Sequence, residues 1–552
     1  MNSDPWVKEK KEVIVENAVA ASAHQLASQA GIEMIQKGGN AVDAAAAVSF
    51  AIGVLEPFMS GIGGGGAINI FLNSGERITI DCYVMAPNDI GDFDWSANGH
   101  KTPCVPGTLA GWDLALELFG TMELEEVVKP ATRYARNGFM IDSYVARFIS
   151  DEIQRMNGAG VKLLLKDGFK TRGIGDRFVN KDLARTLELI GQEGAEAFYK
   201  GEIAEKIVED MEKNGGLITL KDLTQYKPRI YEPAITHYRG YEIQSVPYAH
   251  GGVTVAHMLN VLEEFNPKDL AYDSTSYYHL LAETQKRIFA DRLHYYGDPY
   301  YTDVPWEGLL SKEYAKELAK EIEMDKSSGA VDYGDPWRFD EGYVKPDQSL
   351  KSSYGAGVSG NGDGETTSFS VIDKERNMVA TTQSNGAAFG SGVCVPGCGF
   401  FLNNFIYARG GAGFFPIPWH ANYPKPHKRP LNNHSPTLVF KDDKPFMAFG
   451  SPAGRRQQGA CFQTFVHVAE HGMGIQEAIS APRAHCEGNT LWMESRIPQK
   501  IRIALKDMGH DVTSMPEYTM FFGGLNGVMI NPDTGKLHGG ADPRRPCAAV
   551  GY

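Results

Sequence analysis

The pattern of hydrophobic and polar positions divides the N-terminal part of the chain into helix-like and strand-like segments. Residues 18–37 are rich in alanine, carry apolar residues at helical spacing and stop at Gly38-Gly39. Asn40 can cap a second helix, AVDAAAAVSFAIGVL, and Asp43 stands at its third position, where a capping box needs an acceptor. Because that helix is apolar nearly all round, we expect it to be buried.

A glycine run, SGIGGGGA, comes next, and the strand-like segments AINIFL and RITIDC then flank a turn at Asn73-Ser74-Gly75. The run formally matches GxGxxG, but a dinucleotide site needs a strand before this motif and a helix after it. The order here is reversed, so that reading is rejected. The absence of GxxxxGK[ST], HExxH and GxSxG also removes the P-loop, zincin and α/β-hydrolase readings. Residues 108–330 are mostly helical in pattern.

The character of the chain changes after residue 326. The stretch from Lys326 to Glu365 is polar, rich in Gly, Ser and Asp, and without periodicity. Such a segment buries too little apolar surface to offset its ordering entropy, so we expect a mobile loop. It ends at Thr366, which opens the strand-like TTSFSVI, followed by a turn and a second strand, MVATT. Two further hairpins, TLVF–KDDK–PFMAFG and GVMI–NPDTG–KLHG, are predicted in the C-terminal part.

Composition narrows the class of protein. The 552 residues are 42% hydrophobic and 22% charged, as in an ordinary globular protein. A formal charge of −14 argues against a nucleic-acid partner. No window is apolar enough for a membrane span, and the polar start MNSDPWVKEKKEVIVEN is unlike a secretory signal, so a cytoplasmic location is expected. Seven cysteines are expected to be buried reduced thiols, and no metal or cofactor is implied.

Thr366 is the first candidate for chemistry. A threonine hydroxyl is a poor nucleophile until a base takes its proton. If the chain is cut between Glu365 and Thr366, the new α-amine has a pKa near 8 and can act as that base. Thr366 can make the cut itself by attacking the preceding carbonyl, and a glycine-rich approach lowers the cost of the distortion. Taken alone, a Thr-Thr pair at the start of a strand is ordinary usage of good β-formers.

Resemblance to a known family across the chain indicates a function for Thr366-Thr367. The segment GGNAVDAAAAVSFAIGVLEPFMSGIGGGGAINIF is similar to the N-terminal signature of the gamma-glutamyltransferases, which are N-terminal-nucleophile hydrolases. PGTLAGWDLALELFGTMEL, ADRLHYYGDP, GETTSFSVIDKERNMVATT, RPLNNHSPTLVF, GSPAG, APRAH and DPRR…AAVGY follow in the family's order. The resemblance implies a four-layer αββα sandwich of the α+β class. It also implies autocleavage into a large piece, 1–365, and a small piece, 366–552, which remain partners in one unit.

The same resemblance implies roles for individual residues. Thr366 corresponds to the family's nucleophile, and Ser384 to a threonine whose hydroxyl contacts it. Ala453 and Gly454 match the adjacent glycines whose backbone N–H groups form the oxyanion hole, a role that an alanine side chain leaves intact. Thr367 matches the second threonine of the motif and has at most a supporting role.

The residues that would bind a γ-glutamyl group are largely replaced. Tyr83 stands at the family's arginine position, Phe405 at its glutamine and Ala408 at its aspartate, while Asn432-Asn433 replace a pair of serines. Neither tyrosine nor asparagine reproduces an arginine fork facing a carboxylate. We therefore expect a less charged pocket and a different acyl group.

Two neighbouring positions are less certain in their alignment with the family. The asparagine that follows the Ser384 position in the family falls here on Gly386, unless Asn385 takes its place. Arg455 precedes Arg456 where the family usually has a single arginine. Arg455 is a candidate for an anionic substrate or, with somewhat more weight, for a structural ion pair, and Arg409 is a weaker candidate of the same kind.

Three functions remain open on the sequence. The first is an amidohydrolase that transfers a small acyl group from an amide to Thr366 and then to water. The second is a γ-glutamyl hydrolase or transpeptidase that reads its substrate with other residues. The third is an uncleaved, catalytically silent member used for binding or assembly. A homo-oligomer is compatible with the sequence but is not specified by it.

Overall fold

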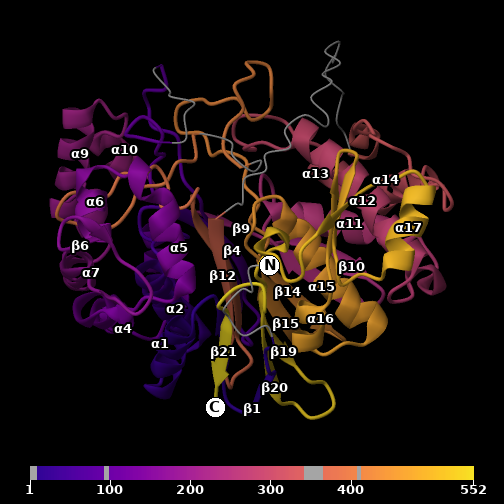
Figure 1. Ribbon diagram of the computed structural model, residues 1–552, viewed down its shortest axis with the longest axis horizontal. Helices are drawn as coiled ribbons and strands as arrows, with labels where there is room; N and C mark the ends of the chain where they lie inside the picture. The colour runs from indigo at the N-terminus through magenta and orange to yellow at the C-terminus, as the bar shows by residue number, and fades with distance from the viewer. Residues whose placement is uncertain (1–8, 92–97, 341–364, 407–411) are drawn as a thin grey trace.

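The computed structural model describes residues 9–91, 98–340, 365–406 and 412–552. Two seven-stranded sheets, antiparallel at every strand pair, lie at the centre of the molecule (Figure 1). The first sheet runs in the order β1 (Val13–Val15), β20 (Leu537–Ala541), β19 (Asn526–Ile530), β15 (Lys444–Gly450), β14 (Thr437–Lys441), β11 (Tyr241–Ser245) and β10 (Ala234–Tyr238). The second runs β21 (Ala548–Gly551), β2 (Val19–Ser22), β12 (Glu365–Ile372), β13 (Met378–Gly386), β3 (Gly65–Phe71), β4 (Arg77–Cys82) and β9 (Arg229–Tyr231).

Helices cover the outer face of each sheet, with those of the N-terminal half on one side and the later ones on the other (Figure 1). The helices on the side of the second sheet are α1 (Gln25–Gln36), α2 (Ala41–Leu55), α3 (Thr108–Phe119), α4 (Leu124–Asn137), α5 (Ser143–Glu152), α6 (Gly158–Leu164), α7 (Lys181–Glu193), α8 (Glu196–Tyr199), α9 (Glu202–Asn214) and α10 (Leu220–Gln225). Those on the side of the first sheet are α11 (Gly251–Glu263), α12 (Thr275–Tyr295), α13 (Trp306–Leu310), α14 (Lys312–Lys320), α15 (Arg456–His471), α16 (Ile475–Ser480) and α17 (Gln499–Asp507).

Smaller elements complete the described chain. A three-stranded sheet of β16 (Ala484–Glu487), β17 (Thr490–Glu494) and β18 (Asp511–Met515) packs beside α12. Two short pairs join β5 (Phe139–Met140) to β8 (Arg177–Phe178) and β6 (Leu165–Lys166) to β7 (Lys170–Thr171). Apolar side chains of both large sheets, among them Ile372 and Leu438, form the layer between them. The order helix, sheet, sheet, helix confirms the predicted αββα sandwich.

The N-terminal predictions are confirmed except at one point. The expected helix over residues 18–37 is wrong at its start, because Val19–Ser22 forms β2 and pairs with β12 and β21. Backbone pairing within the sheet outweighs the helical propensity of alanine there. Asn40 and Asp43 do form the expected capping box, and nearly every residue of α2 is buried. The predicted strands of the C-terminal hairpins are β14–β15 and β19–β20.

The glycine run connects α2 to β3 and lies directly under the end of β13. A Cβ on Gly63 would stand 2.1 Å from the carbonyl oxygen of Phe401, and one on Gly64 only 2.3 Å from that of Ser384. Glycine is needed here because two backbone segments approach more closely than any side chain allows. The glycine run therefore allows the backbone to pass close to Ser384. Because α2 precedes the run and β3 follows it, the order of elements agrees with the rejection of a dinucleotide-binding loop.

The segment before Thr366 is partly ordered, which differs from the prediction of a loop starting at residue 326. Ser327 is buried against α17, where its N–H donates to the carbonyl oxygen of Met508 over 2.7 Å. A 3₁₀ helix, Pro336–Phe339, buries Trp337. A buried tryptophan in a polar stretch thus anchors part of a segment whose average composition predicts a loop. Residues 341–364 lie outside the described part of the chain.

Candidate active site

Thr366 lies near the start of β12, in the interior of the sandwich. It is 4% exposed, and β12 is paired with β13 on one side and β2 on the other. Side chains alternate along the strand, so that Ser368 points across to the other sheet and donates to the carbonyl oxygen of Gly450. The register shifts between Glu365 and Thr367, so this alternation does not fix the direction of the Thr366 side chain. Its direction follows from the hydrogen bond to Ser384 and from its place in the wall of a pocket.

Three hydrogen bonds link four groups around the predicted cleavage site. Thr366 Oγ1 donates to Ser384 Oγ over 3.2 Å, and Ser384 Oγ donates to the carbonyl oxygen of Glu365 over 2.7 Å. The backbone N–H of Gly386 donates to Ser384 Oγ over 2.9 Å. Ser384 thus contacts both the predicted nucleophile and the carbonyl that this residue would attack. The contact expected of Ser384 from the resemblance is present.

The turn after β15 brings Gly454 to the same pocket. Ala453 and Gly454 both have positive φ angles, 98° and 56°, immediately before α15. A positive φ strains a non-glycine residue and is typical of functional turns. Gly454 lines a pocket together with Thr366 and Ser384. Successive amides in a turn at the N-terminus of a helix favour a developing negative charge, as an oxyanion hole requires.

The pocket beside Thr366 is narrow, with a cavity volume of about 30 Å³. Its wall contains three of the predicted substrate-binding residues, Tyr83, Phe405 and Asn433. The rings of Tyr83 and Phe405 are 4.7 Å apart, and both side chains are buried. Burial raises the pKa of Tyr83 well above its usual value, so its hydroxyl stays neutral. This wall is aromatic where the family's substrate pocket carries charge.

Two other predicted residues, Asn385 and Asn432, do not line this pocket. Asn385 faces a separate cavity, bordered by Ser49 and Phe400. Asn432 accepts a hydrogen bond from the backbone N–H of His434 through its side-chain oxygen, which ties it to its own turn. Ala408 and Arg409 lie outside the described residues.

Arg455 is engaged in a buried ion pair. Its Nε lies 2.7 Å from a carboxylate oxygen of Glu487, and His485 stands 3.7 Å from the other oxygen. Burial alone would raise the pKa of Glu487, but Arg455 and His485 outweigh it and hold that pKa below its usual range. Of the two roles considered for Arg455, the structure shows the ion pair.

The structure adds two pocket residues that sequence patterns did not single out. His434 packs edge-on against Tyr83 at 5.1 Å, and burial lowers its pKa to about 3, so it is a neutral imidazole. Gln457, in the first turn of α15, also lines the wall. His434 directly follows Asn432-Asn433 in the RPLNNH motif, and this adjacency was the available signal.

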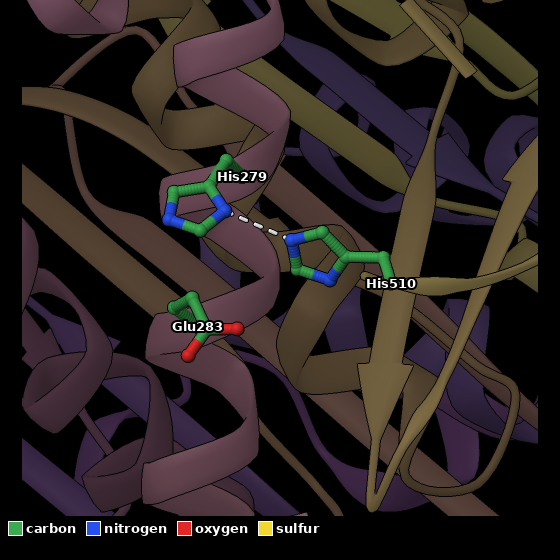
Figure 2. A group of neighbouring side chains, drawn as sticks. All are labelled: His279, Glu283 and His510. Carbon is green, nitrogen blue, oxygen red and sulfur yellow. Dashed lines mark hydrogen bonds between the residues drawn. The ribbon is translucent and has the colours of Figure 1, made fainter. Parts of the chain in front are cut away.

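A second buried polar cluster lies on the other side of the molecule. His279 and Glu283 of α12 meet His510, with His279 Nδ1 and His510 Nε2 2.8 Å apart (Figure 2). The ligand atoms of the three side chains lie close enough to surround a metal ion. However, Glu283 already pairs with Lys286 and Arg287, each at 2.8 Å. Two buried cations beside the carboxylate oppose a third positive charge, so this geometry favours an ion-pair cluster.

Other features of the described chain bear on the broad class. All seven cysteines are buried and unpaired, as expected. None of the described helices combines the length and the apolar character that crossing a membrane requires.

Comparison with known proteins identifies the family. The model of the family described as gamma-glutamyltranspeptidase matches residues 27–552. The chain belongs to the gamma-glutamyltranspeptidase family. A glutathione hydrolase proenzyme of Bacillus subtilis (strain 168) is 35% identical over 98% of this chain and 93% of that protein. An acylase ACY 1 proenzyme of Pseudomonas sp. (strain SE83) is 36% identical over 97% and 93%. Like its family, the chain is an amidohydrolase that acts on C–N bonds.

The solved structures agree with this assignment. A cephalosporin acylase from Bacillus halodurans superposes with a TM-score of 0.89 at 28% identity, covering 100% of this chain and 99% of that one. The gamma-glutamyltranspeptidase of Helicobacter pylori gives a TM-score of 0.54 at 34% identity over 63% of this chain. The family shares the αββα sandwich and maturation from a proenzyme, which confirms the predicted fold and function class.

Proposed function

We propose that Thr366 is the nucleophile of a self-cleaving amidohydrolase whose acyl group lacks the paired charges of a γ-glutamyl unit. One observation carries the proposal. The hydroxyl of Thr366 reaches a pocket walled by Tyr83 and Phe405, and it is hydrogen-bonded to Ser384. The hydroxyls of Thr366 and Ser384 are thus retained, while aromatic side chains, Tyr83 and Phe405, stand at the positions that would bind the charged groups of an α-amino acid.

Maturation follows from the hydrogen-bonded chain. Thr366 Oγ1 gives up its proton and attacks the carbonyl carbon of Glu365, while Ser384 donates to the carbonyl oxygen. The C–N bond breaks, the nitrogen takes a proton and becomes the α-amine of Thr366, and an ester joins Glu365 to Thr366. Water then hydrolyses the ester, which leaves a carboxylate on Glu365 and the free hydroxyl of Thr366.

Turnover uses the same atoms with an external amide. The α-amine accepts the proton of the hydroxyl as Thr366 attacks the substrate carbonyl, and it passes the proton to the leaving amine. The backbone N–H groups of Ala453 and Gly454 are proposed to stabilise the oxyanion. In other enzymes, removal of one such donor typically lowers the rate ~10²–10³-fold. Water releases the acyl group and restores the enzyme.

The wall of the pocket indicates the kind of acyl group. Aromatic side chains bind apolar and planar groups, and the polar groups of Asn433, Gln457 and His434 can orient them. Arg455, the cation considered for an anionic substrate, is paired with Glu487 instead. Uncharged aliphatic or aromatic acyl groups are therefore the proposed substrates. The 35% and 36% identities to a glutathione hydrolase and an acylase are too similar to favour either, so the proposal rests on the residues that line the pocket.

A panel of anilides tests this choice. The purified, processed protein is assayed on γ-glutamyl, acetyl, butyryl and phenylacetyl anilides, and kcat/KM is compared. We expect the best neutral acyl group to exceed γ-glutamyl at least ~10-fold, since one well-placed contact in an apolar pocket is worth ~1–3 kcal/mol. A γ-glutamyl value equal to or above the neutral ones would support the γ-glutamyl alternative and overturn the proposal on the acyl group.

A pair of substitutions then assigns the preference to the wall. Phe405→Ala enlarges the pocket and should shift the preference toward bulkier acyl groups. Phe446→Ala removes the same side chain from a core that does not line the pocket, so its substrate preference should match that of the parent protein. An unchanged preference in Phe405→Ala would place the acyl group elsewhere.

A further inference from the structure

Arg545, the second arginine of the DPRR motif, lies beside the proposed nucleophile. It is 2% exposed, and its Nη1 donates to the carbonyl oxygen of Thr366 over 3.2 Å. The same nitrogen contacts the sulfur of Met59 at 3.7 Å. None of the roles described above uses this side chain. A buried guanidinium on the backbone of the nucleophile calls for an explanation.

The neighbouring arginines show that this contact is unlike ordinary structural pairing. Arg544 pairs with Glu494 and Asp542, and Arg483 pairs with Asp542, all in the interior. Arg545 turns the other way and crosses the face of Gly524, where an added Cβ would stand 2.3 Å from Arg545 Cδ. Glycine at position 524 thus leaves the space through which Arg545 reaches Thr366.

The titratable groups facing Arg545 come from several elements: Tyr144 of α5, Cys547, Glu56 after α2 and Glu365 of β12. Burial raises the pKa of Tyr144 and that of Cys547, so both side chains are neutral. Glu56 is 1% exposed, and its Oε2 has no hydrogen-bond partner among the described residues. Burial raises the pKa of Glu56 to about 8 although the charge of Arg545 opposes this rise. At neutral pH the positive charge of Arg545 is therefore only partly compensated from this side.

We propose that Arg545 is a positioning residue for Thr366, which fixes the carbonyl end of the nucleophile and disfavours a proton on its α-amine. The α-amine and the carbonyl oxygen belong to the same residue, so a guanidinium 3.2 Å from that oxygen lies within a few ångströms of the amine. A nearby positive charge favours the neutral form of an amine. The neutral form is the one that can accept the proton of the hydroxyl.

The pH profile of the processed enzyme tests this inference, which rests on the proposed role of Thr366. In Arg545→Gln, the amine should hold its proton to higher pH. The acid limb of kcat/KM should therefore move upward by ~1 pH unit, the lower end of the effect of one nearby charge. Arg545→Lys keeps the charge and should keep the acid limb while losing part of kcat through poorer positioning. Arg239→Gln, which breaks an ion pair with Glu470 away from the pocket, should match the parent.

Folding failure of Arg545→Gln is covered by a second variant. Gly524→Ala leaves the arginine in the chain but displaces its side chain, so kcat should fall several-fold with KM unchanged. If Arg545→Gln is processed and folded but has the parent's pH profile and kcat, the inference is wrong. The inference is also wrong if the Arg545→Gln variant does not fold and the Gly524→Ala variant has the kcat and pH profile of the parent protein. Failure of the proposed nucleophile looks different, because Thr366→Ala would then retain activity.

Discussion

Two buried polar clusters can be compared directly, the one around Thr366 and the one around His279, Glu283 and His510. Both contain groups from each side of the predicted cleavage site, and both concentrate groups that could do chemistry. In the second cluster the carboxylate of Glu283 is matched by two cations, Lys286 and Arg287. Around Thr366 the contacts are single hydrogen bonds between hydroxyls, a carbonyl and an amide.

The difference shows how to separate a site from a scaffold. The negative charge of a carboxylate that pairs with two cations is already neutralised by them. Breaking one of these pairs leaves an unpaired buried charge. Hydroxyls whose hydrogen-bond partners are neutral remain available to react, because moving their protons does not break an ion pair. A cluster of titratable groups therefore indicates a functional site only when its members can still bind or react with a substrate, and are not already neutralised by their neighbours. The predictions below separate the two clusters.

The largest effect is expected from Thr366→Ala. Without the hydroxyl there is no nucleophile for either the cut or turnover, so the chain should remain a single piece with no amidase activity. Thr366→Ser retains a hydroxyl and should still be processed, though more slowly. Denaturing gels of both variants after long incubation provide the measurement. Cleavage of the alanine variant would mean that another residue makes the cut.

Next in size is Glu283→Ala in the other cluster. It leaves Lys286 and Arg287 buried beside each other, and breaking such a pair costs ~3–5 kcal/mol of stability. Urea unfolding should show the loss, while the acid limb of the activity profile stays where it is. Lys374→Ala removes one of an exposed pair of charged side chains and should change stability very little. A Glu283→Ala protein of parental stability would contradict the ion-pair interpretation.

A smaller effect is expected from Ser384→Ala. It removes the donor to the carbonyl of Glu365 and the acceptor of the Thr366 hydroxyl, so processing should slow by ~10²-fold, as for other donors to a developing oxyanion. Ser384→Thr restores the hydroxyl and should process at nearly the parental rate. The appearance of the two pieces over time on a gel gives both rates. Equal rates in the alanine variant and the parent would exclude a role for Ser384 in the cut.

The mildest effect concerns pH. Burial lowers the pKa of His510 to about 4 and also lowers that of His279. A histidine whose pKa is lowered by folding is neutral in the native state, so acid favours the unfolded state. Its contribution to stability is lost as pH falls from about 6.5 toward 4. His510→Gln cannot take up that proton, and its Tm should fall less steeply than the parent's over this window. Parallel Tm curves would show that the pair does not titrate there.

Much of the fold could be predicted from sequence because its signals are local. The capping box at Asn40 and the hairpin turns each depend on a few adjacent residues. β2 was missed because its alanines favour helix locally, while its pairing with β12 bridges more than 340 residues of sequence. Trp337 was missed for a similar reason, since its burial depends on distant elements.

The site divides in the same way. Thr366, Ser384 and Gly454 were placed by motifs, and the structure brings them together. Phe405 and Tyr83 were placed by resemblance to positions of known role. Arg545 could not be found, and His434 had only its adjacency to Asn432-Asn433 as a signal, because the importance of both comes from contacts made across the fold. The cytoplasmic location and the oligomeric state stay predictions.

The central claim is that Thr366 becomes the first residue of a separate piece. Intact mass spectrometry of the freshly purified, denatured protein measures this directly. The account predicts two masses in equal amounts, those of residues 1–365 and 366–552, with Thr366 at the N-terminus of the second. A single mass of 60.5 kDa that persists on incubation, or a cut at any other bond, would contradict it.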